Sequence, residues 1–235
     1  MTYISGFVAA VPTARRDEYF EFAKRVDAVM VEHGATRVVD GWAADVPRGT
    51  TTDFYRAVAA EDGEEVVFGW MEWPDKAALD AGMGAAMKDE RMSGAPPFDG
   101  KRMIYGSFLP VVERRFKDGE PGYIDAFIAP VSAAKKDAFI TMSEDGATAF
   151  GAQGALFDLE CWGEDVPHGS TTDFYRATKA EGDEMPGLSF VGWPDKATRD
   201  AGWAEMMKEP GPAEMPFDGK RMFFGGFSVV SDIKK

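Results

Sequence analysis

Hydrophobic and polar positions follow two different periods along the first half of the chain. Residues 3–11 alternate with period two, which predicts a strand, and both of its faces are largely apolar. Apolar residues then recur at helical spacing from Tyr19 to His33, and Gly34 is placed to end that helix. Further segments predicted in the same way are strands at 35–44, 66–73 and 102–112 and a helix at 76–88.

The order of these elements is strand, helix, strand, strand, helix, strand. It is typical of the ferredoxin-like split βαβ arrangement, an antiparallel sheet with both helices on one face. The other face of the sheet would be bare in a single unit. We assign to it the first-strand face that carries Tyr3 and Phe7, together with Tyr105 of the last strand. Because water disfavours such a face, we expect a second unit to cover it.

The second half of the chain repeats the first. YISGFVAAV from Tyr3 returns as YIDAFIAPV from Tyr123, and DVPRGTTTDFYRA from Asp45 returns as DVPHGSTTDFYRA from Asp165. Roughly two positions in five are identical, and a period this long indicates duplicated domains. We therefore predict an α+β fold in which two tandem ferredoxin-like repeats form one intramolecular pseudo-dimeric α/β barrel. The predicted boundaries are 1–112 for the first repeat, 113–122 for a linker and 123–235 for the second repeat.

The stretch PFDGKRM occurs twice, at Pro97–Met103 and at Pro216–Met222. Proline, aspartate and glycine in this order favour a turn, after which the lysine and arginine enter the last strand. We interpret the stretch as a structural turn that sets the register of that strand, rather than as catalytic. The acid and the arginine of each copy are expected to pair: Asp99 with Arg102, and Asp218 with Arg221.

Together these segments resemble a known family. The start YI.GF, the run DVP.G followed by TDF, and PFDGKRM with its aromatic strand are similar to the YbaA-like family of bacterial proteins, a domain of unknown function. The resemblance covers nearly the whole chain, once per half. It implies the dimeric α/β-barrel superfamily, whose members pair two separate chains, so that the pair is fused here. That superfamily includes cofactor-free monooxygenases, isomerases, dechlorinases, haem-degrading enzymes and ligand binders, so it implies no particular activity.

Charge and composition limit the classes of partner that we expect for this protein. A net charge of -14 and a pI near 4.6 disfavour nucleic-acid binding. Apolar runs are too short for a membrane span, and charge appears too early for a signal peptide. The single cysteine, Cys161, cannot form an internal disulfide, which favours a cytoplasmic location. We expect a monomer or a weak homodimer.

Metal and cofactor sites are not expected. The chain has 2 histidines, His33 on the apolar side of a helix and His168 in a polar loop, and neither has metal-ligand spacing to another donor. No dinucleotide-binding or phosphate-binding motif is present in the sequence.

Candidate site residues come from the strand faces. Asp125 shares a face with Tyr123, which we place inside the barrel opposite Ser5, its counterpart in the first half. A carboxylate in an apolar lumen would have a raised pKa and could act as a general base, so Asp125 is a weak catalytic candidate. Two tryptophans share strand faces with Asp40 and Glu160 respectively. The candidate ligand-binding residues are Tyr3, Ser5, Trp42, Tyr123, Asp125 and Trp162.

The two copies differ most in their first helix and third strand. Gly146 stands where the first copy has Val26, and Met185-Pro186-Gly187 replaces Glu65-Val66-Val67. Lost volume and weaker strand pairing favour a cavity or a mobile segment in the second copy, although drift explains the same differences.

The leading functional hypothesis is therefore binding of a small, partly apolar ligand, in the lumen or between sheet and helix. A cofactor-independent monooxygenase or isomerase with Asp125 as base is the first alternative. A structural or interaction scaffold without ligand is the second, and a filled lumen would favour it.

Overall fold

The computed structural model describes residues 2–209, 211 and 214–235. The first half contains β1 (Tyr3–Pro12), α1 (Arg16–Glu32), β2 (Arg37–Asp45), α2 (Phe54–Ala57), β3 (Glu64–Trp73), α3 (Lys76–Ala86) and β4 (Ile104–Arg115). The second half repeats this order with β5 (Tyr123–Ser132), α4 (Lys136–Ala152), β6 (Phe157–Asp165), α5 (Phe174–Thr178), β7 (Glu184–Trp193), α6 (Lys196–Met206) and β8 (Phe223–Lys234). Three short 3-10 helices complete the list: η1 (Thr13–Arg15), η2 (Glu90–Met92) and η3 (Ala133–Lys135).

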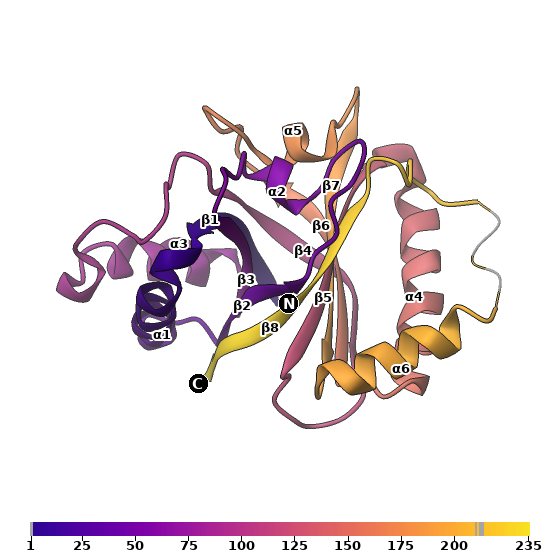
Figure 1. Cartoon of the computed structure of the whole chain (residues 1–235), viewed down its shortest axis with the longest axis horizontal. Coiled ribbons are helices and arrows are strands. Elements are labelled where there is room, and N and C mark those ends of the chain that lie inside the picture. Colours follow the sequence, from indigo (N-terminus) through magenta and orange to yellow (C-terminus); the bar gives the residue numbers. More distant parts are fainter. Residues whose placement is uncertain (1, 210, 212–213) are drawn as a thin grey trace.

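The eight strands form one closed barrel in the order β1-β3-β2-β8-β5-β7-β6-β4. Two antiparallel junctions join the halves, β2 with β8 and β4 with β6. Helices α1 and α3 cover one side of the barrel, and α4 and α6 cover the opposite side (Figure 1). The predicted fold class, tandem ferredoxin-like repeats that form an α/β barrel, is confirmed. No helix among the described residues has the length and apolar character needed to cross a membrane.

The barrel lumen is filled by apolar side chains from both halves. Ile4 and Val8 of β1 belong to this core, and ring contacts cross it, such as Trp70 with Phe190 at 4.3 Å between centroids. The interior face is thus the Ile4/Val8 face, and our assignment of the Tyr3/Phe7 face to the interior was wrong. Both faces of β1 are apolar, so its alternation could not tell the lumen side from the helix side.

One end of the barrel is closed by the short helices α2 and α5, which we did not predict from the sequence (Figure 1). Phe54 and Phe174 begin these helices and are fully buried. Phe54 packs 5.1 Å from the ring of Phe227 and 4.9 Å from the ring of Phe223. Reciprocal hydrogen bonds tie the two helices together, from Thr52 Oγ1 to the carbonyl of Ala177 (2.6 Å) and from Thr172 Oγ1 to the carbonyl of Ala57 (2.7 Å).

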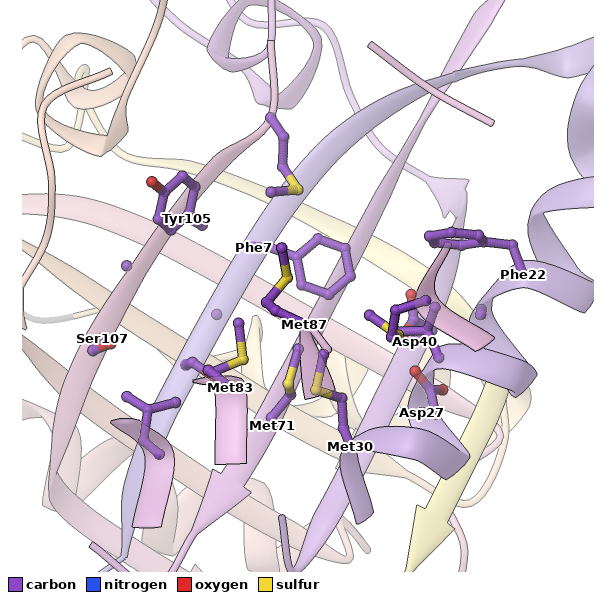
Figure 2. Close-up of a pocket in the computed structure, with 18 of the residues that line it drawn as sticks. Phe7, Phe22, Asp27, Met30, Asp40, Met71, Met83, Met87, Tyr105 and Ser107 are labelled. Atoms are coloured by element: carbon purple, nitrogen blue, oxygen red, sulfur yellow. The ribbon is translucent and has the colours of Figure 1, made fainter. Parts of the chain in front are cut away.

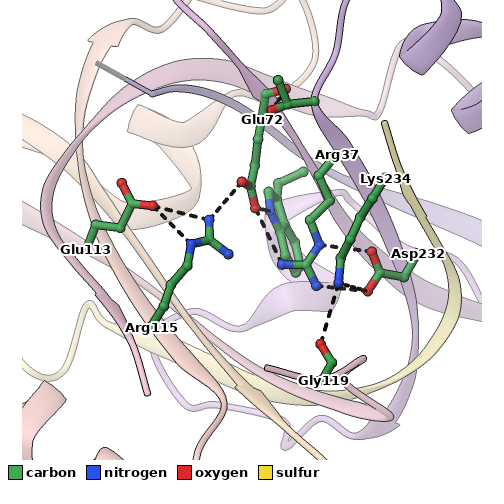
Figure 3. Close-up of polar contacts among 9 residues, drawn as sticks. Arg37, Glu72, Glu113, Arg115, Gly119, Asp232 and Lys234 are labelled. Carbon is green, nitrogen blue, oxygen red and sulfur yellow. Dashed lines mark hydrogen bonds and ion pairs between the residues drawn. The ribbon is translucent and has the colours of Figure 1, made fainter. Parts of the chain in front are cut away.

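Ion pairs close the other end (Figure 3). Arg37 is buried and donates two hydrogen bonds to Asp232, at 2.9 and 2.8 Å. Its guanidinium also lies 3.5 Å from Glu72, which accepts a bond from Arg115 at 2.9 Å. The Arg37 guanidinium stacks on Phe157, its counterpart by repeat, at 4.8 Å from the ring centroid. Both ends are closed and apolar side chains fill the core, so of the two locations that we named for a ligand, the space between sheet and helix fits the structure and the lumen does not.

Three local expectations also need correction. Strand β4 continues to Arg115, so the first three residues of the expected linker pair with β6. Strand β7 pairs regularly with β5 through its Met-Pro-Gly segment, where Pro130 opposes Pro186, contrary to the weak pairing that we expected. Helix α4 spans 17 residues, as α1 does, despite its glycines. A Cβ at Gly151 would lie 2.6 Å from the ring of Phe116, so this glycine lets the linker pack on the helix.

Candidate functional site

A pocket lies between the sheet and the helix pair in each half. The first-half pocket has a volume of about 700 Å³ and is bounded by β1, β2, β3, β4 and the helices α1 and α3. Its walls are mainly methionine and aromatic side chains (Figure 2). The methionines that line it are Met30, Met71, Met83, Met87, Met92 and Met103. Flexible thioethers adapt to ligands of varied shape, so this wall suits an apolar molecule.

The polar end of the first-half pocket is formed by Tyr19, Asp27 and Asp40. Tyr19 and Asp27 come from the buried face of α1, and Asp40 comes from β2. The Tyr19 hydroxyl donates to Asp40 Oδ1, and the two carboxyls share a second hydrogen bond. Figure 2 shows Asp27 and Asp40 beside Met30 at one side of the pocket. Both carboxyls are almost fully buried, and Asp27 Oδ2 has no hydrogen-bond partner among the described residues.

Burial controls the protonation of this cluster. Desolvation and, after it, the neighbouring Asp40 charge raise the pKa of Asp27 to about 10, while a hydrogen bond from Ser231 opposes the rise. Desolvation also raises the pKa of Asp40 to about 6, while bonds from Tyr19 and Asp27 oppose the rise. At neutral pH the pair therefore shares one proton and carries one negative charge. The pair thus offers a base and an acid side by side.

A β-bulge lies beside Asp40. In the β2–β8 junction Asp40 opposes Ser231 whereas Gly41 opposes Val229, so Val230 is the extra residue. The β4–β6 junction has the same irregularity, where Glu160 opposes Val112 and Cys161 opposes Pro110. Bulges re-aim side chains and are common beside functional sites. Asp40 and Glu160 are thus equivalent carboxyls at equivalent bulges.

The second-half pocket is larger, about 1020 Å³, and lies between β5, β6, β7 and the helices α4 and α6. Glu160 lines it and is nine-tenths buried. Ser143 Oγ donates to Glu160 Oε2 at 3.0 Å, and Ser189 Oγ donates to the same oxygen. Burial raises the pKa of Glu160 to about 7, and it raises the pKa of the neighbouring Asp158 to about 9.

All six residues that the sequence analysis selected for ligand binding lie on the helix-covered face of the sheet. Tyr3 packs under α3, and Ser5 accepts a hydrogen bond from Trp73 Nε1 at 3.1 Å. Asp125 is buried against α6, where it pairs with Arg199 at 2.8 Å and accepts a bond from Trp203 Nε1 at 2.8 Å. Of the six, only Ser5 lines the first-half pocket, and none lines the second-half pocket. The others are Trp42 in the core beneath α1, Trp162 in the core beneath α4, and Tyr123 in the core beside Trp193.

The arginines of the two PFDGKRM turns tie the last strand of each half to the third. Arg102 donates to Asp99 at 3.3 Å and makes two shorter bonds to Glu64, at 2.6 and 2.7 Å. Arg221 makes the corresponding bonds to Asp218 at 3.1 Å and to Glu184 at 2.7 and 2.8 Å. Each side chain therefore joins a turn to the start of β3 or β7.

No group of three or more His, Cys, Asp or Glu side chains suited to a metal ion is present in the described part of the chain. His33 contacts Asp89 at 3.2 Å, and exposed His168 stacks on Tyr175. Cys161 is buried in the lumen core, where desolvation raises the pKa of its thiol well above the usual value.

Sequence reasoning missed Tyr19 and Asp27 as site residues. Tyr19, Ala23 and Asp27 recur at four-residue steps, so a carboxyl falls on the apolar face of a helix. That misplaced acid is the available signal, because buried acids are rare unless they are paired.

Comparison with known proteins gives a family and a fold. The family described as "Protein of unknown function (DUF1428)" matches residues 2–100 and again residues 122–219. "Uncharacterized protein YbaA" of Escherichia coli (strain K12) is 48% identical over 116 residues, which is 48% of this chain and 99% of that protein. The YbaA protein of Shigella flexneri shows the same identity and coverage.

Solved structures show the same fold at low identity. A "putative monooxygenase" from Fusobacterium nucleatum has a TM-score of 0.62 at 10% identity and covers 100% of this chain and 94% of its own. A protein with the same description from Lactobacillus acidophilus NCFM has a TM-score of 0.59 at 11% identity, with 99% and 96% covered. An anthrone oxidase-like protein has a TM-score of 0.52 at 13% identity, with 99% and 93% covered. These likenesses concern the fold.

Proposed function

Because the chain belongs to the family described as "Protein of unknown function (DUF1428)", which carries no assigned activity, we propose a function from its geometry. The protein binds a small, largely apolar molecule in the first-half pocket, with the polar end of the molecule at Asp27 and Asp40. The observation that carries this proposal is a pocket of about 700 Å³ whose polar end is formed by two buried carboxyls, one of which has an oxygen, Asp27 Oδ2, that makes no hydrogen bond of ordinary geometry in the described structure. Small-molecule sites are mainly apolar cavities of roughly 300–1,000 Å³ with a few convergent polar groups.

Filling the pocket tests the proposal. Trp203 occupies on α6 the position that Met83 occupies on α3, so Met83→Trp introduces a side chain that the fold already accepts in its other half. We expect the wild-type protein to bind the neutral fluorescent probe N-phenyl-1-naphthylamine, and Met83→Trp to lose at least about 10-fold in affinity, because the indole occupies the probe's volume.

The matched control is Ala81→Trp, an exposed position of the same helix that does not line the pocket. It should bind the probe as the wild type does. Equal binding by the wild type and Met83→Trp, or no binding by either, would contradict the proposal, and the second result would favour the scaffold alternative.

A cofactor-independent enzyme is a second candidate, and the carboxyl pair favours it. Asp40 can accept a proton from a bound carbon acid while Asp27 donates a hydrogen bond to the adjacent carbonyl oxygen, so an enolate would form beside its stabilising donor. This assignment replaces Asp125 as the base, because Arg199 and two tryptophans already occupy the Asp125 carboxylate.

Proton exchange tests this second candidate. With 2-tetralone in D2O, we expect the wild type to accelerate exchange of the hydrogens next to the carbonyl, and Asp40→Asn to lower that rate by about 100-fold. Asp125→Asn should retain the acceleration if it folds, which a circular dichroism melt verifies. Equal exchange rates in the wild type and Asp40→Asn would rule out Asp40 as the base.

A further inference from the structure

The charged side chains that line the first-half pocket are all acidic. Among its described lining residues are four acids, Asp27, Asp40, Asp80 and Asp165, and none of the lining side chains is a lysine, arginine or histidine. Lys76 compensates the two acids at the rim, because its ammonium group lies 3.3 Å from Asp80 and 3.0 Å from Asp165. No lysine, arginine or histidine acts on Asp27 or Asp40 in the part of the chain that the structure describes.

The buried pair also lacks a positively charged donor among the described residues. Asp40 accepts hydrogen bonds from Tyr19 and Asp27. The neighbour of Asp27 on β8 is the neutral Ser231 hydroxyl, which lowers the Asp27 pKa, but neither Asp27 Oδ2 nor Ser231 Oγ makes a hydrogen bond of ordinary geometry in the described structure. A carbonyl or carboxylate oxygen that is buried without a donor costs free energy, and so does a buried negative charge without a counterion. A ligand that supplies both a hydrogen-bond donor and a positive charge would remove both costs at once.

The side chains that line the rest of the pocket indicate the chemistry of the remaining part of the ligand. Beyond the carboxyls the lining is mostly apolar and includes six methionines, and the rings of Phe22 and Phe98 meet edge to face at 5.8 Å between centroids. Sulfur and ring faces favour both apolar groups and the neighbourhood of an organic cation. We propose that the first-half pocket takes an apolar organic amine, with its ammonium group at Asp27 Oδ2 and Asp40 and its body against the methionines. This inference rests on the proposed binding function.

The second-half pocket differs in this respect. Its lining includes Lys208 as well as acids, and both buried serines already donate to Glu160. The open acceptor that calls for a cationic donor is therefore a feature of the first-half pocket.

A matched ligand series tests the inference on the full-length protein. Competition against N-phenyl-1-naphthylamine is measured for 2-(2-naphthyl)ethylamine, 2-(2-naphthyl)ethanol and 3-(2-naphthyl)propionic acid, which share one ring system and differ in charge. We expect the amine to bind about 10-fold more tightly than the alcohol, because a hydrogen bond to a charged group is stronger than a neutral one. The acid should bind at least about 10-fold more weakly than the alcohol, since its charge repels Asp40.

Variants separate charge from shape. Asp40→Asn should abolish the preference for the amine while it keeps the affinity for the alcohol. Asp27→Asn keeps the Asp40 charge and should keep the preference, and the exposed Asp62→Asn is the charge-matched control on the surface. A preference that persists in Asp40→Asn would overturn the inference.

The wild-type protein alone provides a second readout, which does not depend on the folding of a variant. The groups that face Asp40 and Asp27 are Tyr19 from α1 and, through Asp27, the neutral Ser231 and the charged Asp232 from β8. Because the pKa of Asp40 is about 6, affinity for the amine should fall by up to 10-fold for each pH unit below about 6. Affinity for the alcohol should stay constant across the same range.

The outcomes distinguish the two proposals. If no member of the series displaces the probe and the probe itself does not bind, both the binding function and the amine inference fail. If the alcohol binds as well as the amine, or the acid binds best, the binding function stands and the amine inference is overturned.

Discussion

The two pockets contain carboxyls at equivalent positions, but the hydrogen-bond partners of these carboxyls differ. Asp40 of β2 and Glu160 of β6 each lie opposite a bulge in the neighbouring strand from the other half, which is β8 for Asp40 and β4 for Glu160. Asp40 is bonded by a tyrosine and a second carboxyl, whereas Glu160 is bonded by Ser143 and Ser189. The two halves therefore share the position of the carboxyl in the sheet, but the groups that bond to this carboxyl differ. A carboxyl pair can take up or release a proton readily, and two hydroxyls hold a carboxylate in place.

The covering helices differ as well. In the second half, α6 is fixed to β5 by polar contacts, because Asp125 accepts bonds from Arg199 and Trp203 of that helix. At the corresponding positions, α3 carries the apolar Leu79 and Met83 above Ser5. Helix α3, which covers the first-half pocket, is therefore fixed to the sheet mainly by apolar packing. Such packing can adjust to a bound ligand at a lower free-energy cost than breaking a buried ion pair.

The largest expected effect comes from removing Arg199 from its buried ion pair with Asp125. Arg199→Leu copies the first half but leaves Asp125 buried without its counterion, so we expect a loss of about 3–5 kcal/mol in the free energy of unfolding. The double variant Asp125→Ser with Arg199→Leu copies both first-half residues and should recover most of that loss. Urea denaturation measures both. A single variant as stable as the wild type would show that the ion pair does not fix α6.

The second expected effect is a difference in pH dependence between the two carboxyls. Asp40 has a folded-state pKa of about 6, above its usual value of 3.8, so its stabilising contribution is complete below about pH 4 and lost as pH rises through 6. Asp40→Asn lacks this loss. Relative to the wild type, it should gain about 1.4 kcal/mol per pH unit between pH 4 and 6, or about 3 kcal/mol in all.

Glu160→Gln is the matched comparison. The folded-state pKa of Glu160 is about 7 against a usual 4.5, so the same gain should continue to about pH 7. Urea denaturation at half-unit pH steps would show the two windows. Unfolding curves of both variants that shift in parallel with the wild type at every pH would refute the assigned pKa values.

The smallest expected effect comes from Ser143→Ala, which places in α4 the alanine found at Ala23 of α1. The variant removes the 3.0 Å hydrogen bond to Glu160, and we expect a loss of about 1 kcal/mol at pH 8. Because that bond lowers the pKa of Glu160, the pKa should rise in the variant. Infrared titration of the carboxyl band measures the rise, and an unchanged band would show that Ser189 alone sets the environment of Glu160.

The sequence predicted the repeat and the order of elements because both can be read from the residue pattern without knowledge of tertiary contacts. It did not predict which face of β1 lines the lumen, because Ile4 and Tyr3 are both apolar and the choice depends on the closed barrel. Helix α2 was missed because four residues leave little periodic pattern, and Phe54 acquires its role only where the barrel ends.

The candidate site followed the same rule. Asp40 and Glu160 were noted on their strands beside tryptophans, but their importance depends on partners brought by another element. Tyr19 and Asp27 reach Asp40 only because α1 packs over β2. Pairings of this kind depend on tertiary packing, which the period of a single helix or strand does not encode.

The most direct test of the account is a crystal structure of the full-length protein grown with 2-(2-naphthyl)ethylamine. The account predicts that the ring lies between the first-half sheet and helices α1 and α3, with the nitrogen within about 3 Å of Asp27 Oδ2 and Asp40. A first-half pocket closed by its own methionines, with the amine absent or bound only in the second half, would contradict it.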